Sequence, residues 1–494
     1  MALKLFTLPA DTQVPFAGNP AGDMNGVVDC LNDAGYQFSI CNKAWAGGAP
    51  LDGVSDCTAA IQACMNAAAP FGAPVLIPAG VQFRVSQLTW NAGQILQGVY
   101  GGTYPGGNAI TTASLLVRLP STNLDLISIP DGANYGAIRD LAIDGNKNNN
   151  TAGRGIAILD GAAGQECQIF IERCYIHDNP DSNIYSGFQR RCNKILYNVC
   201  NYSAFGDGIT DCGSDNTIMG NVTGSNGRAG INLGTTATQN WAAFGSQHSS
   251  NVAHVTDNDC YQNVVGIAVS QFCANAMIRG NGIDRNTKQG ITVYDGSSNC
   301  IEDNSLHSNG TLTHNTYAHI DVGTNVASVG INENNFGPLD AGVTNVASYC
   351  VNYGGSTGGI ITGNIGEQDA TASVGGLINS ISNTPSFLMM SKGGAIIQGS
   401  GNDVLDIRNS SGSLLTKITQ GGSFVHSGGG AQFTAYVEPG NGSTAGGHIW
   451  SGSGAPNIAA SVAGDFYFRT DTPSTSSQRI YIATAANTWT ALAV

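Results

Sequence analysis

The sequence predicts an all-β protein built on a right-handed parallel β-helix of three sheets, and one short repeated frame carries most of this prediction. The frame is an apolar residue, two spacers and an asparagine, as in the stretch ILYN at residues 195–198. Successive copies are separated by 23, 37, 23, 23, 30 and 30 residues, a spacing typical of solenoid repeats. The asparagines of the frame are Asn198, Asn221, Asn258, Asn281, Asn304, Asn334 and Asn364.

A second short apolar strand, usually opened by glycine, lies between these frames, as at Gly208-Ile209 and Gly290-Ile291. Runs of about 4 to 6 residues rich in Ile, Val and Thr, divided by Gly, Asn, Asp and Ser, indicate strands and turns. Stacked coils lie about 4.8 Å apart, so an asparagine amide can bond the coils above and below it. We therefore expect the asparagine column to be buried and structural.

The beginning of the chain resembles the opening of pectate-lyase-like β-helix proteins. The resemblance rests on LDGVSDCTAAIQACMNAA at residues 51–68 and PVLIPAGVQF at residues 74–83. It implies a capping helix near residues 58–69 with Asp56 as its N-cap and with an inward face of Ile61, Cys64, Met65 and Ala68. The same opening precedes lyases, polygalacturonases, epimerases, phage tailspikes and non-catalytic adhesins, so it indicates architecture and leaves the activity open.

The end of the chain has a different pattern, because the asparagine frame stops near residue 380. Residues 403–418 read as strand, Ser-Gly turn and strand, and they resemble phage tail-fibre repeats in which three chains intertwine. Residues 454–494 resemble a small carboxy-terminal module of phage tail and fibre proteins. This resemblance implies a homotrimer, since such thin strands have little core in one chain. A small β-domain that only caps the helix is the alternative.

These resemblances together identify the chain as similar to a bacteriophage tail spike or tail fibre. They imply a location in the virion tail after assembly in the host cytoplasm, contacts with other phage tail proteins through the amino terminus, and a host surface glycan as the partner. The expected domains are an attachment segment at 1–24, the β-helix at 25–380, the intertwined fibre-like region at 381–453 and the small β module at 454–494.

Composition narrows the classes of partner. The chain has 494 residues with a formal charge of −14, which argues against a nucleic-acid partner. The sequence contains no run of about 18 apolar residues, so we predict no membrane insertion. Residues 1–19 lack the pattern of a signal peptide. The 13 cysteines are expected to be small core residues in a reducing compartment. A local disulfide among Cys30, Cys41, Cys57 and Cys64 is an alternative that the sequence does not decide.

The predicted site lies where ionisable residues of neighbouring coils coincide. Glycosidic hydrolysis needs two carboxylates across a groove, so Asp207, Asp211 and Asp181 are the catalytic candidates. Alternatively, Asp207 and Asp211 only close turns, and His177 and Arg228 are surface turn residues. A long insertion at residues 234–251 contributes aromatic residues that suit sugar stacking. The predicted glycan-binding residues are His177, Tyr185, Arg228, Asn232, Trp241, Phe244 and His248.

Three functions remain open. The first is a tailspike that binds and depolymerises host polysaccharide, the second a non-catalytic receptor-binding or structural fibre, and the third a bacterial polysaccharide lyase or epimerase. Polygalacturonase motifs are missing, and a pectate-type lyase would need a cationic base and calcium ligands that this cation-poor body does not offer. The sequence has no Cys-x-x-Cys pair, so the cysteines do not indicate a zinc site. We therefore predict no cofactor and no metal ion, and leave the enzymatic activity undecided between hydrolase and lyase.

Overall fold

The computed structural model contains two compact units, residues Met1–Gly393 and Gly394–Val494. It describes residues 38–99, 113–162, 166–234, 252–270, 273–314, 316–337, 340, 342–345, 347–354, 359–366, 378–380 and 389–390 of the first unit. In the second unit it describes residues 403–408, 414–419, 424–426, 449–453, 455–456, 466–469, 471 and 479–492. The attachment segment expected at residues 1–24 lies outside the described residues.

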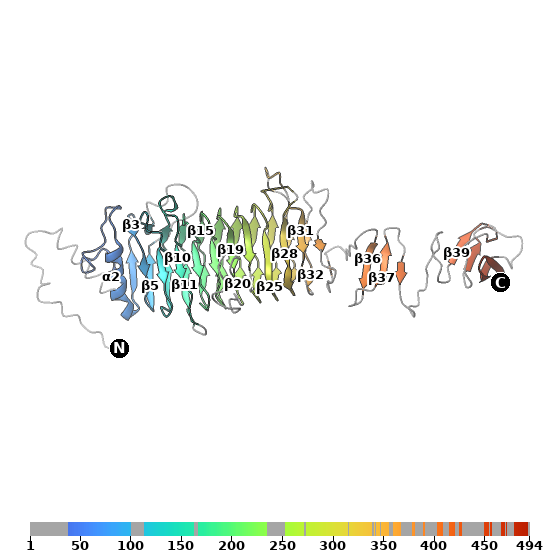
Figure 1. Ribbon diagram of the computed structural model, residues 1–494, viewed down its shortest axis with the longest axis horizontal. Coiled ribbons are helices and arrows are strands. Elements are labelled where there is room, and N and C mark those ends of the chain that lie inside the picture. The colour runs from blue at the N-terminus through green and yellow to red at the C-terminus, as the bar shows by residue number, and fades with distance from the viewer. Residues whose placement is uncertain are drawn as a thin grey trace, which may run out of the picture. The chain divides into compact units, whose positions relative to one another are not determined.

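The first unit is a right-handed parallel β-helix of three sheets, as the sequence predicts (Figure 1). The chain passes from sheet A to sheet B to sheet C in each coil and then returns to sheet A, as in β8, β9 and β10. Sheet A consists of β1 (Phe38–Ser39), β2 (Pro74–Ile77), β5 (Gln94–Gly98), β8 (Gly136–Arg139), β11 (Ile169–Glu172), β14 (Lys194–Leu196), β17 (Thr217–Met219), β20 (His254–Thr256), β23 (Met277–Arg279), β26 (Cys300–Glu302), β29 (Gly330–Asn332), β32 (Ile360–Thr362) and β35 (Met389–Met390).

Sheets B and C are built in the same way. Sheet B consists of β3 (Gln82–Val85), β6 (Leu115–Arg118), β9 (Ala142–Asp144), β12 (Tyr175–His177), β15 (Val199–Asn201), β18 (Val222–Gly224), β21 (Asp259–Tyr261), β24 (Gly282–Asp284), β27 (Ser305–His307), β30 (Asn335–Phe336) and β33 (Ile365–Gly366). Sheet C consists of β4 (Leu88–Thr89), β7 (Ile127–Ile129), β10 (Ile156–Ile158), β13 (Ile184–Ser186), β16 (Ile209–Asp211), β19 (Ala229–Leu233), β22 (Val265–Val269), β25 (Ile291–Ser297), β28 (Ala318–Ala327), β31 (Tyr349–Tyr353) and β34 (Ile378–Ser380).

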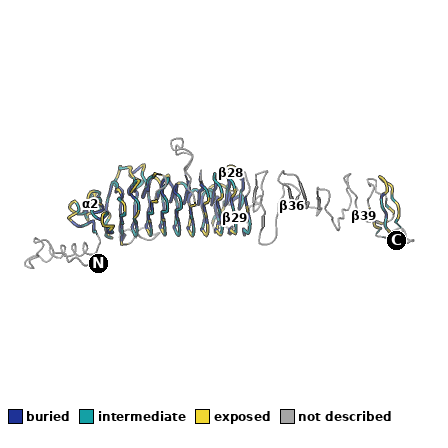
Figure 2. The backbone as a smooth tube through the Cα atoms, turned by 90° about the horizontal axis from the view of Figure 1, so that it is seen from below, coloured by how far each residue is buried: buried dark blue, intermediate teal, exposed yellow. Residues whose placement is uncertain are grey.

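The apolar residue of the repeated frame points into the coil and forms the core. In sheet A, Ile195 pairs in register with Ile218, which pairs with Val255, and all three are fully buried. Figure 2 shows this burial along the stacked strands. Because side chains of a strand alternate between its two faces, the residues on either side of these apolar positions point outward. The register therefore decides which polar residues can reach a ligand.

The predicted asparagine column is confirmed at the corner between sheets A and B. Asn281 is fully buried, and its Nδ2 donates to the carbonyl of Val255 (3.0 Å) and to Oδ1 of Asn304 (2.9 Å). Its backbone N–H donates to the same Oδ1 (3.0 Å). The residue before each asparagine of the column is left-handed, with φ between 54° and 68°. Each corner is thus a left-handed residue followed by an asparagine that bonds the neighbouring coils.

Two further asparagine columns stand at the other corners, and the sequence analysis missed both. At the corner between sheets B and C, Asn286 donates through Nδ2 to the carbonyl of Cys260 (3.0 Å) and to Oδ1 of Asn309 (2.8 Å). At the corner between sheets C and A, the N–H of Asn193 donates to Oδ1 of Asn216 (2.7 Å). The B–C column consists of Asn226, Asn263, Asn286 and Asn309.

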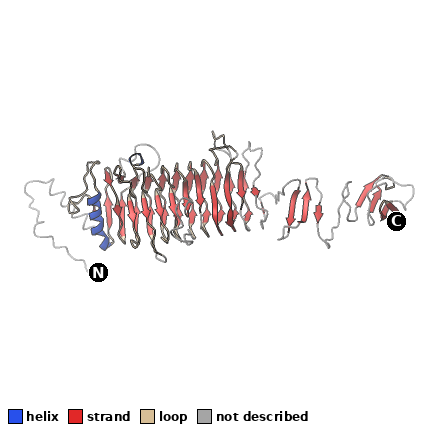
Figure 3. Ribbon diagram, viewed as in Figure 1, coloured by secondary structure: helices blue, strands red, loops and turns tan. Residues whose placement is uncertain are grey.

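The predicted capping helix is α2 (Thr58–Ala68), continued by the 3₁₀ turn η2 (Ala69–Phe71). Figure 3 shows α2 at the amino-terminal end of the stacked strands. The expected inward face is confirmed, with Ala60 in addition; the buried residues are Ala60, Ile61, Cys64, Met65 and Ala68. The N-cap position is one residue later than predicted, at Cys57. Asp56 still caps the helix, because its Oδ1 accepts from the N–H (2.8 Å) and the hydroxyl (2.5 Å) of Thr58.

Most of the described cysteines behave as small core residues, whereas Cys41, Cys192 and Cys300 are partly exposed. Cys174, Cys200 and Cys260 are buried, and burial raises the pKa of Cys174 and Cys260 to about 12. Cys57 is buried with a free thiol, so it takes no part in a disulfide. No helix in the described part of the chain is both long and apolar enough to cross a membrane.

The second unit contains two small sheets. The strand, turn and strand expected at residues 403–418 are confirmed as β36 (Asp403–Arg408) and β37 (Leu414–Thr419), which pair antiparallel and are followed by β38 (Phe424–His426). The other sheet consists of β39 (Ile449–Gly452), β40 (Phe466–Arg469), β41 (Ile480–Ala485) and β42 (Thr488–Leu492). Its described core is an aromatic group, in which Tyr467 makes edge contacts with Tyr481 and Trp489.

Candidate functional site

The turns that lead from sheet B to sheet C form a continuous surface over four coils. The N–H of Lys147 donates to the carbonyl of Asp178 (2.9 Å), the N–H of Phe205 to that of Pro180 (3.0 Å), and the N–H of Arg228 to that of Gly206 (3.0 Å). Most of the polar residues that the sequence predicts as a site lie on or beside these turns. We call the solvent-facing residues of this region the B–C turn surface; they are Lys147, Asp178, Asp181, Tyr202, Phe205 and Arg228.

Asp207 lies beneath this surface and is the centre of a hydrogen-bond network. Its carboxylate is 1% exposed and accepts from Arg228 at both oxygens, from Nε at 3.1 Å and from Nη2 at 2.5 Å. It also accepts from the hydroxyl of Thr210 (2.7 Å), the N–H of Ala229 (2.9 Å) and Nδ2 of Asn232 (3.2 Å). A buried carboxylate with this many donors serves to hold two coils together.

Asp211 points to the other side of its strand. It pairs in register with Ser186 and Leu233, in the column that faces the interior of the coil, and it is fully buried. Its Oδ1 accepts from Nδ2 of Asn216 (2.6 Å) and from the N–H of Gly213 (3.2 Å). Asp207 and Asp211 therefore do not face a common outer groove, and the geometry does not support them as a pair of glycosidase carboxylates.

Asp181 and Phe205 are the solvent-exposed part of the predicted cluster. Asp181 is exposed, and its Oδ1 accepts from the N–H of Ser182 (2.8 Å). Phe205, on the next coil, is 74% exposed, so its ring gains little from packing within the chain. The sequence analysis did not single out Phe205. The available signal was an aromatic residue in a turn of small and polar residues, two positions before Asp207.

Tyr185 and Asn232 lie on the outer face of sheet C, one on each side of Thr210 in the register. The hydroxyl of Tyr185 donates to Oδ1 of Asp160 (3.0 Å), and the guanidinium of Arg154 lies 4.2 Å from its ring centre. Burial raises the pKa of Tyr185, which keeps the phenol protonated. Asn232 is 1% exposed and accepts from the hydroxyl of Ser270 (2.8 Å). Tyr185 is partly exposed and can contact a ligand. Asn232 is buried and donates a hydrogen bond to Asp207.

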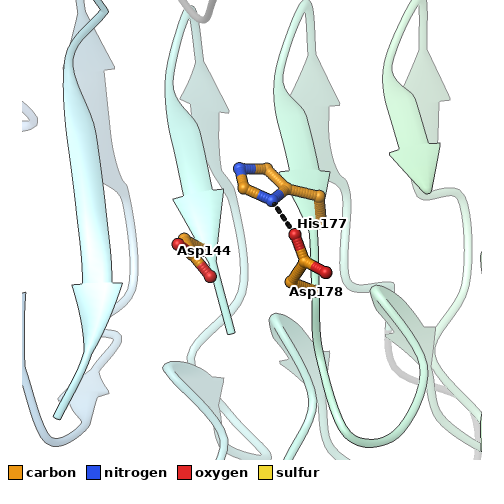
Figure 4. Close-up of side chains that lie close together, drawn as sticks. All are labelled: Asp144, His177 and Asp178. Atoms are coloured by element: carbon orange, nitrogen blue, oxygen red, sulfur yellow. Dashed lines mark hydrogen bonds and ion pairs between the residues drawn. The ribbon is translucent and has the colours of Figure 1, made fainter. Parts of the chain in front are cut away.

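His177 is buried, and not a residue of the turn surface as one alternative expected. It is the last residue of β12 and pairs in register with Asp144 of β9, so both side chains lie on the outer side of sheet B. Its Nδ1 lies 2.7 Å from Oδ2 of Asp178, and its ring stacks on that of Tyr175 at 4.3 Å. Figure 4 shows the imidazole beside Asp144 and Asp178. The side chain is therefore held in one orientation.

The two carboxyl groups beside His177 have different electrostatic environments. Burial raises the pKa of Asp144. Burial alone would also raise the pKa of Asp178, but the hydrogen bonds from His177 and Lys147 outweigh it, so the pKa of Asp178 is lowered. Nζ of Lys147 lies 2.9 Å from Oδ1 of Asp178 and donates to the carbonyl of Tyr202 (2.7 Å). Asp178 is thus the ionised partner of a histidine and a lysine.

A second group of the same composition lies further along sheet B, at Asp284, His307 and Asp340. Here a cation already occupies the centre, because Nε of Arg285 lies 2.6 Å from Asp284 and 3.2 Å from Asp340. His307 is partly exposed, and its Nδ1 lies 3.4 Å from Asp340. The group is an ion-pair network that links neighbouring turns.

The aromatic insertion lies outside the described residues. This applies to three of the predicted glycan-binding residues, Trp241, Phe244 and His248. They remain predictions.

Comparisons with known proteins give one partial family match and several solved structures of low identity. Residues 198–348 match a family described as "Periplasmic copper-binding protein (NosD)", a match that covers less than half of the chain. No curated protein sequence is significantly similar. Among solved structures, the A-module of Azotobacter vinelandii mannuronan C-5 epimerase AlgE6 is 18% identical, with 69% of this chain and 99% of that chain covered and a TM-score of 0.48.

Two viral proteins are similar to the same degree. The Dettilon tailspike protein (gp208) is 14% identical, with 72% of each chain covered and a TM-score of 0.48. ORF18 of Geobacillus virus E2 is 13% identical, with 96% of this chain and 88% of that chain covered and a TM-score of 0.45. At these identities the likeness is one of fold.

Proposed function

We propose that this chain is a phage tail spike or tail fibre whose β-helix binds a polysaccharide of the host cell surface along the B–C turn surface. The observation that carries the proposal is the exposed ring of Phe205 between a carboxylate and a guanidinium. Asp181 precedes it by one coil, Arg228 follows it by one coil, and backbone hydrogen bonds join the three turns. A sugar ring offers an apolar C–H face to an aromatic ring and hydroxyl pairs to charged groups on either side.

The chain orients Arg228 before any ligand arrives. Its ion pair with the buried Asp207 holds the guanidinium, while the Arg228 side chain remains 37% exposed. A group held in place loses less conformational entropy when a ligand binds than a mobile one does. The repeat of about 4.8 Å per coil also presents similar groups at regular spacing, which suits an extended polymer.

The same contacts favour binding over hydrolysis by the predicted carboxylates. A catalytic carboxylate must come within hydrogen-bond reach of the glycosidic oxygen or the anomeric carbon. Asp207 is instead saturated by donors of the chain, and Asp211 faces the interior. The function that the described residues support best is therefore that of a non-catalytic glycan receptor-binding protein.

Binding to purified polysaccharides tests this proposal. Capsular polysaccharides, lipopolysaccharides and cell-wall glycans from a panel of bacteria would be titrated against the full chain, with reducing ends and absorbance of unsaturated uronates followed in parallel. We expect saturable binding without product, and a loss of about tenfold or more in affinity for Phe205→Ala, because burial of an aromatic side chain contributes about 1.5–3 kcal/mol.

Tyr197→Ala is the matched control, since Tyr197 is 55% exposed at the opposite, A–B corner. Equal losses of affinity in Phe205→Ala and Tyr197→Ala would contradict glycan binding at the B–C turn surface. The absence of binding by the parent chain across the panel would contradict it as well. Release of reducing ends by the parent chain would contradict the non-catalytic assignment, with unsaturated uronates indicating a lyase and their absence a hydrolase.

A further inference from the structure

The group formed by Asp144, His177 and Asp178 contains a buried histidine nitrogen that its surroundings leave unused. Asp144 and His177 are register partners on neighbouring coils, and the ligand-type atoms of the three residues all lie within 4.8 Å of one another. The side chain of His177 is only 4% exposed. Its Nε2 is buried and has no hydrogen-bond partner among the described residues.

The hydrogen bond to Asp178 decides which ring nitrogen is available. A carboxylate only accepts, so Nδ1 of His177 carries the proton that is donated to Oδ2 of Asp178 across 2.7 Å. In the neutral ring Nε2 is then an unprotonated acceptor. Leaving a buried acceptor without a donor is unfavourable. A polymer cannot reach a nitrogen this deeply buried, so its ligand would have to be a small ion.

We propose that His177, through Nε2, and Asp144, through its carboxylate, bind a divalent transition-metal ion of the zinc class. Imidazole and carboxylate are ligands that zinc accepts. A histidine that binds a metal through one ring nitrogen usually donates its other N–H to a carboxylate, which is the arrangement of His177 and Asp178. Asp178 is thus a positioning residue and not a ligand. The ion would join two successive coils beside the B–C turn surface.

Two cations lie near the group and limit the affinity of the site. Lys147 neutralises the outer oxygen of Asp178, at 2.9 Å. Arg118 directs its guanidinium to the carbonyls of Ala152, Gly153 and Arg154 and to Oδ1 of Asn179. Asp144 accepts from the N–H of Asn146 (2.7 Å), which orients its carboxylate. Only His177 and Asp144 would hold the ion, so we expect a single exchangeable ion.

The chain provides its own control in the group of Asp284, His307 and Asp340. This group has the same residue types in the same sheet, but the guanidinium of Arg285 lies between its carboxylates. A guanidinium in that position excludes a metal ion by charge and by volume. Substitutions there should leave metal binding unchanged.

The test is metal titration of the full chain after dialysis against a chelator. Zn²⁺ binding would be followed by calorimetry, and Co²⁺ binding by its visible absorption, which reports nitrogen ligation. We expect one equivalent to bind the parent chain and Asp284→Asn, and that equivalent to be lost in His177→Gln and Asp144→Asn. Asp178→Asn should weaken binding by about 10 to 100-fold, as expected for a residue that orients a ligand.

Circular dichroism and thermal melting check that each variant is folded, and Asp144→Asn replaces His177→Gln as the deciding variant if the latter does not fold. Binding of equal strength in the parent chain, Asp144→Asn and His177→Gln would overturn the proposal, as would an absence of binding by the parent chain. Glycan binding is measured separately, so failure of the metal site and failure of the proposed function are distinguishable.

Discussion

Each buried asparagine supplies hydrogen bonds that a tight corner takes away from the backbone. Asn281 donates through Nδ2 to both neighbouring coils, at Val255 and Asn304, and its Oδ1 accepts from the N–H of Asn258 on the preceding coil. The same arrangement recurs in Asn286 at the next corner. The left-handed residue before each asparagine keeps its backbone bond to the next coil, as where the N–H of Asp303 donates to the carbonyl of Asn332 (3.2 Å). The N–H of the asparagine itself donates to the asparagine side chain of the next coil, as from Asn304 to Asn334 (3.1 Å). The short amide side chain offers two N–H donors and a carbonyl acceptor, so one asparagine can bond the coils on both sides.

Removal of one of these amides should lower stability without changing the fold. Asn281→Ala leaves the carbonyl of Val255 and the N–H of Asn258 without their partners. We expect the free energy of unfolding to fall by about 1–3 kcal/mol, measured by denaturant titration. Asn286→Ala should cost a similar amount. Asn325, which is exposed on β28, is the control, and Asn325→Ala should change stability by less than about 0.5 kcal/mol.

His319 makes the stability of the β-helix depend on pH. It is buried at the end of the B–C asparagine column, where its Nδ1 accepts from Nδ2 of Asn309 (3.2 Å). Burial, with a smaller contribution from His307, lowers the pKa of His319 from 6.5 to about 4. The unfolded chain therefore binds a proton between these values and the folded chain does not, so stability falls as pH falls from 6.5 to 4.

This loss should disappear when the titrating group is removed. Thermal melting of the parent chain between pH 7 and pH 4 should show a decline to which His319 contributes about 3 kcal/mol. His319→Gln keeps a polar group of similar size and should melt with a weaker dependence on pH. An unchanged dependence in His319→Gln would contradict the assignment to this residue.

The residue scale is also where prediction from the sequence fails. The apolar-x-x-Asn frame revealed the A–B column. The B–C column stands five residues further on in four of the coils, and the same frame recurs there, as in Ile283-x-x-Asn286 and Leu306-x-x-Asn309, but only the first copy in each coil was counted. Whether an aspartate in a short strand points inward or outward depends on a shift of one residue. Asp207 and Asp211 could not be separated on that basis, and the structure shows that Asp211 points inward.

At the scale of elements, the capping helix solves the problem of an exposed sheet end. Side-chain hydrogen bonds attach it to the first coils. The N–H of Thr89 donates to Gln62 (2.8 Å), Nε2 of Gln62 donates to the carbonyl of Thr89 (2.9 Å), and the N–H of Ser86 donates to the hydroxyl of Thr58 (2.8 Å). An uncovered strand edge would otherwise pair with other chains. This element was predictable, because a capping helix has its own local signals.

The first turn of α2 should depend on Asp56. Asp56→Ala removes the acceptor of the N–H and hydroxyl of Thr58, so we expect a loss of about 0.5–2 kcal/mol in the free energy of unfolding. Asp56→Asn retains a side-chain oxygen at the same place and should preserve most of the stability. If both substitutions cost the same, the charge of Asp56 matters more than its hydrogen bonds, and the capping argument is wrong.

At the scale of the whole molecule, the described side chains of the second unit form only a small core. Among its residues with described side chains, the buried ones are Tyr467, Tyr481 and Ala483. Phe466 and Phe468 of β40 are 37% and 41% exposed. Sheets of three and four short strands need further apolar contacts for independent stability. The apolar surface on β40 is physically consistent with association, which is the expectation drawn from the fibre-like sequence pattern.

We therefore predict that the full chain is a homotrimer in solution. Sedimentation equilibrium at micromolar concentration should give three times the mass of 50.8 kDa for one chain. Replacing an exposed aromatic residue of β40 in Phe468→Asp should weaken the assembly, because association would bury a charge in an apolar interface. Leu312 is 56% exposed on the β-helix, so Leu312→Asp is the matched control and should remain trimeric. A monodisperse monomer would rule out the fibre-like assembly, since the apolar surface of β40 would then stay in water.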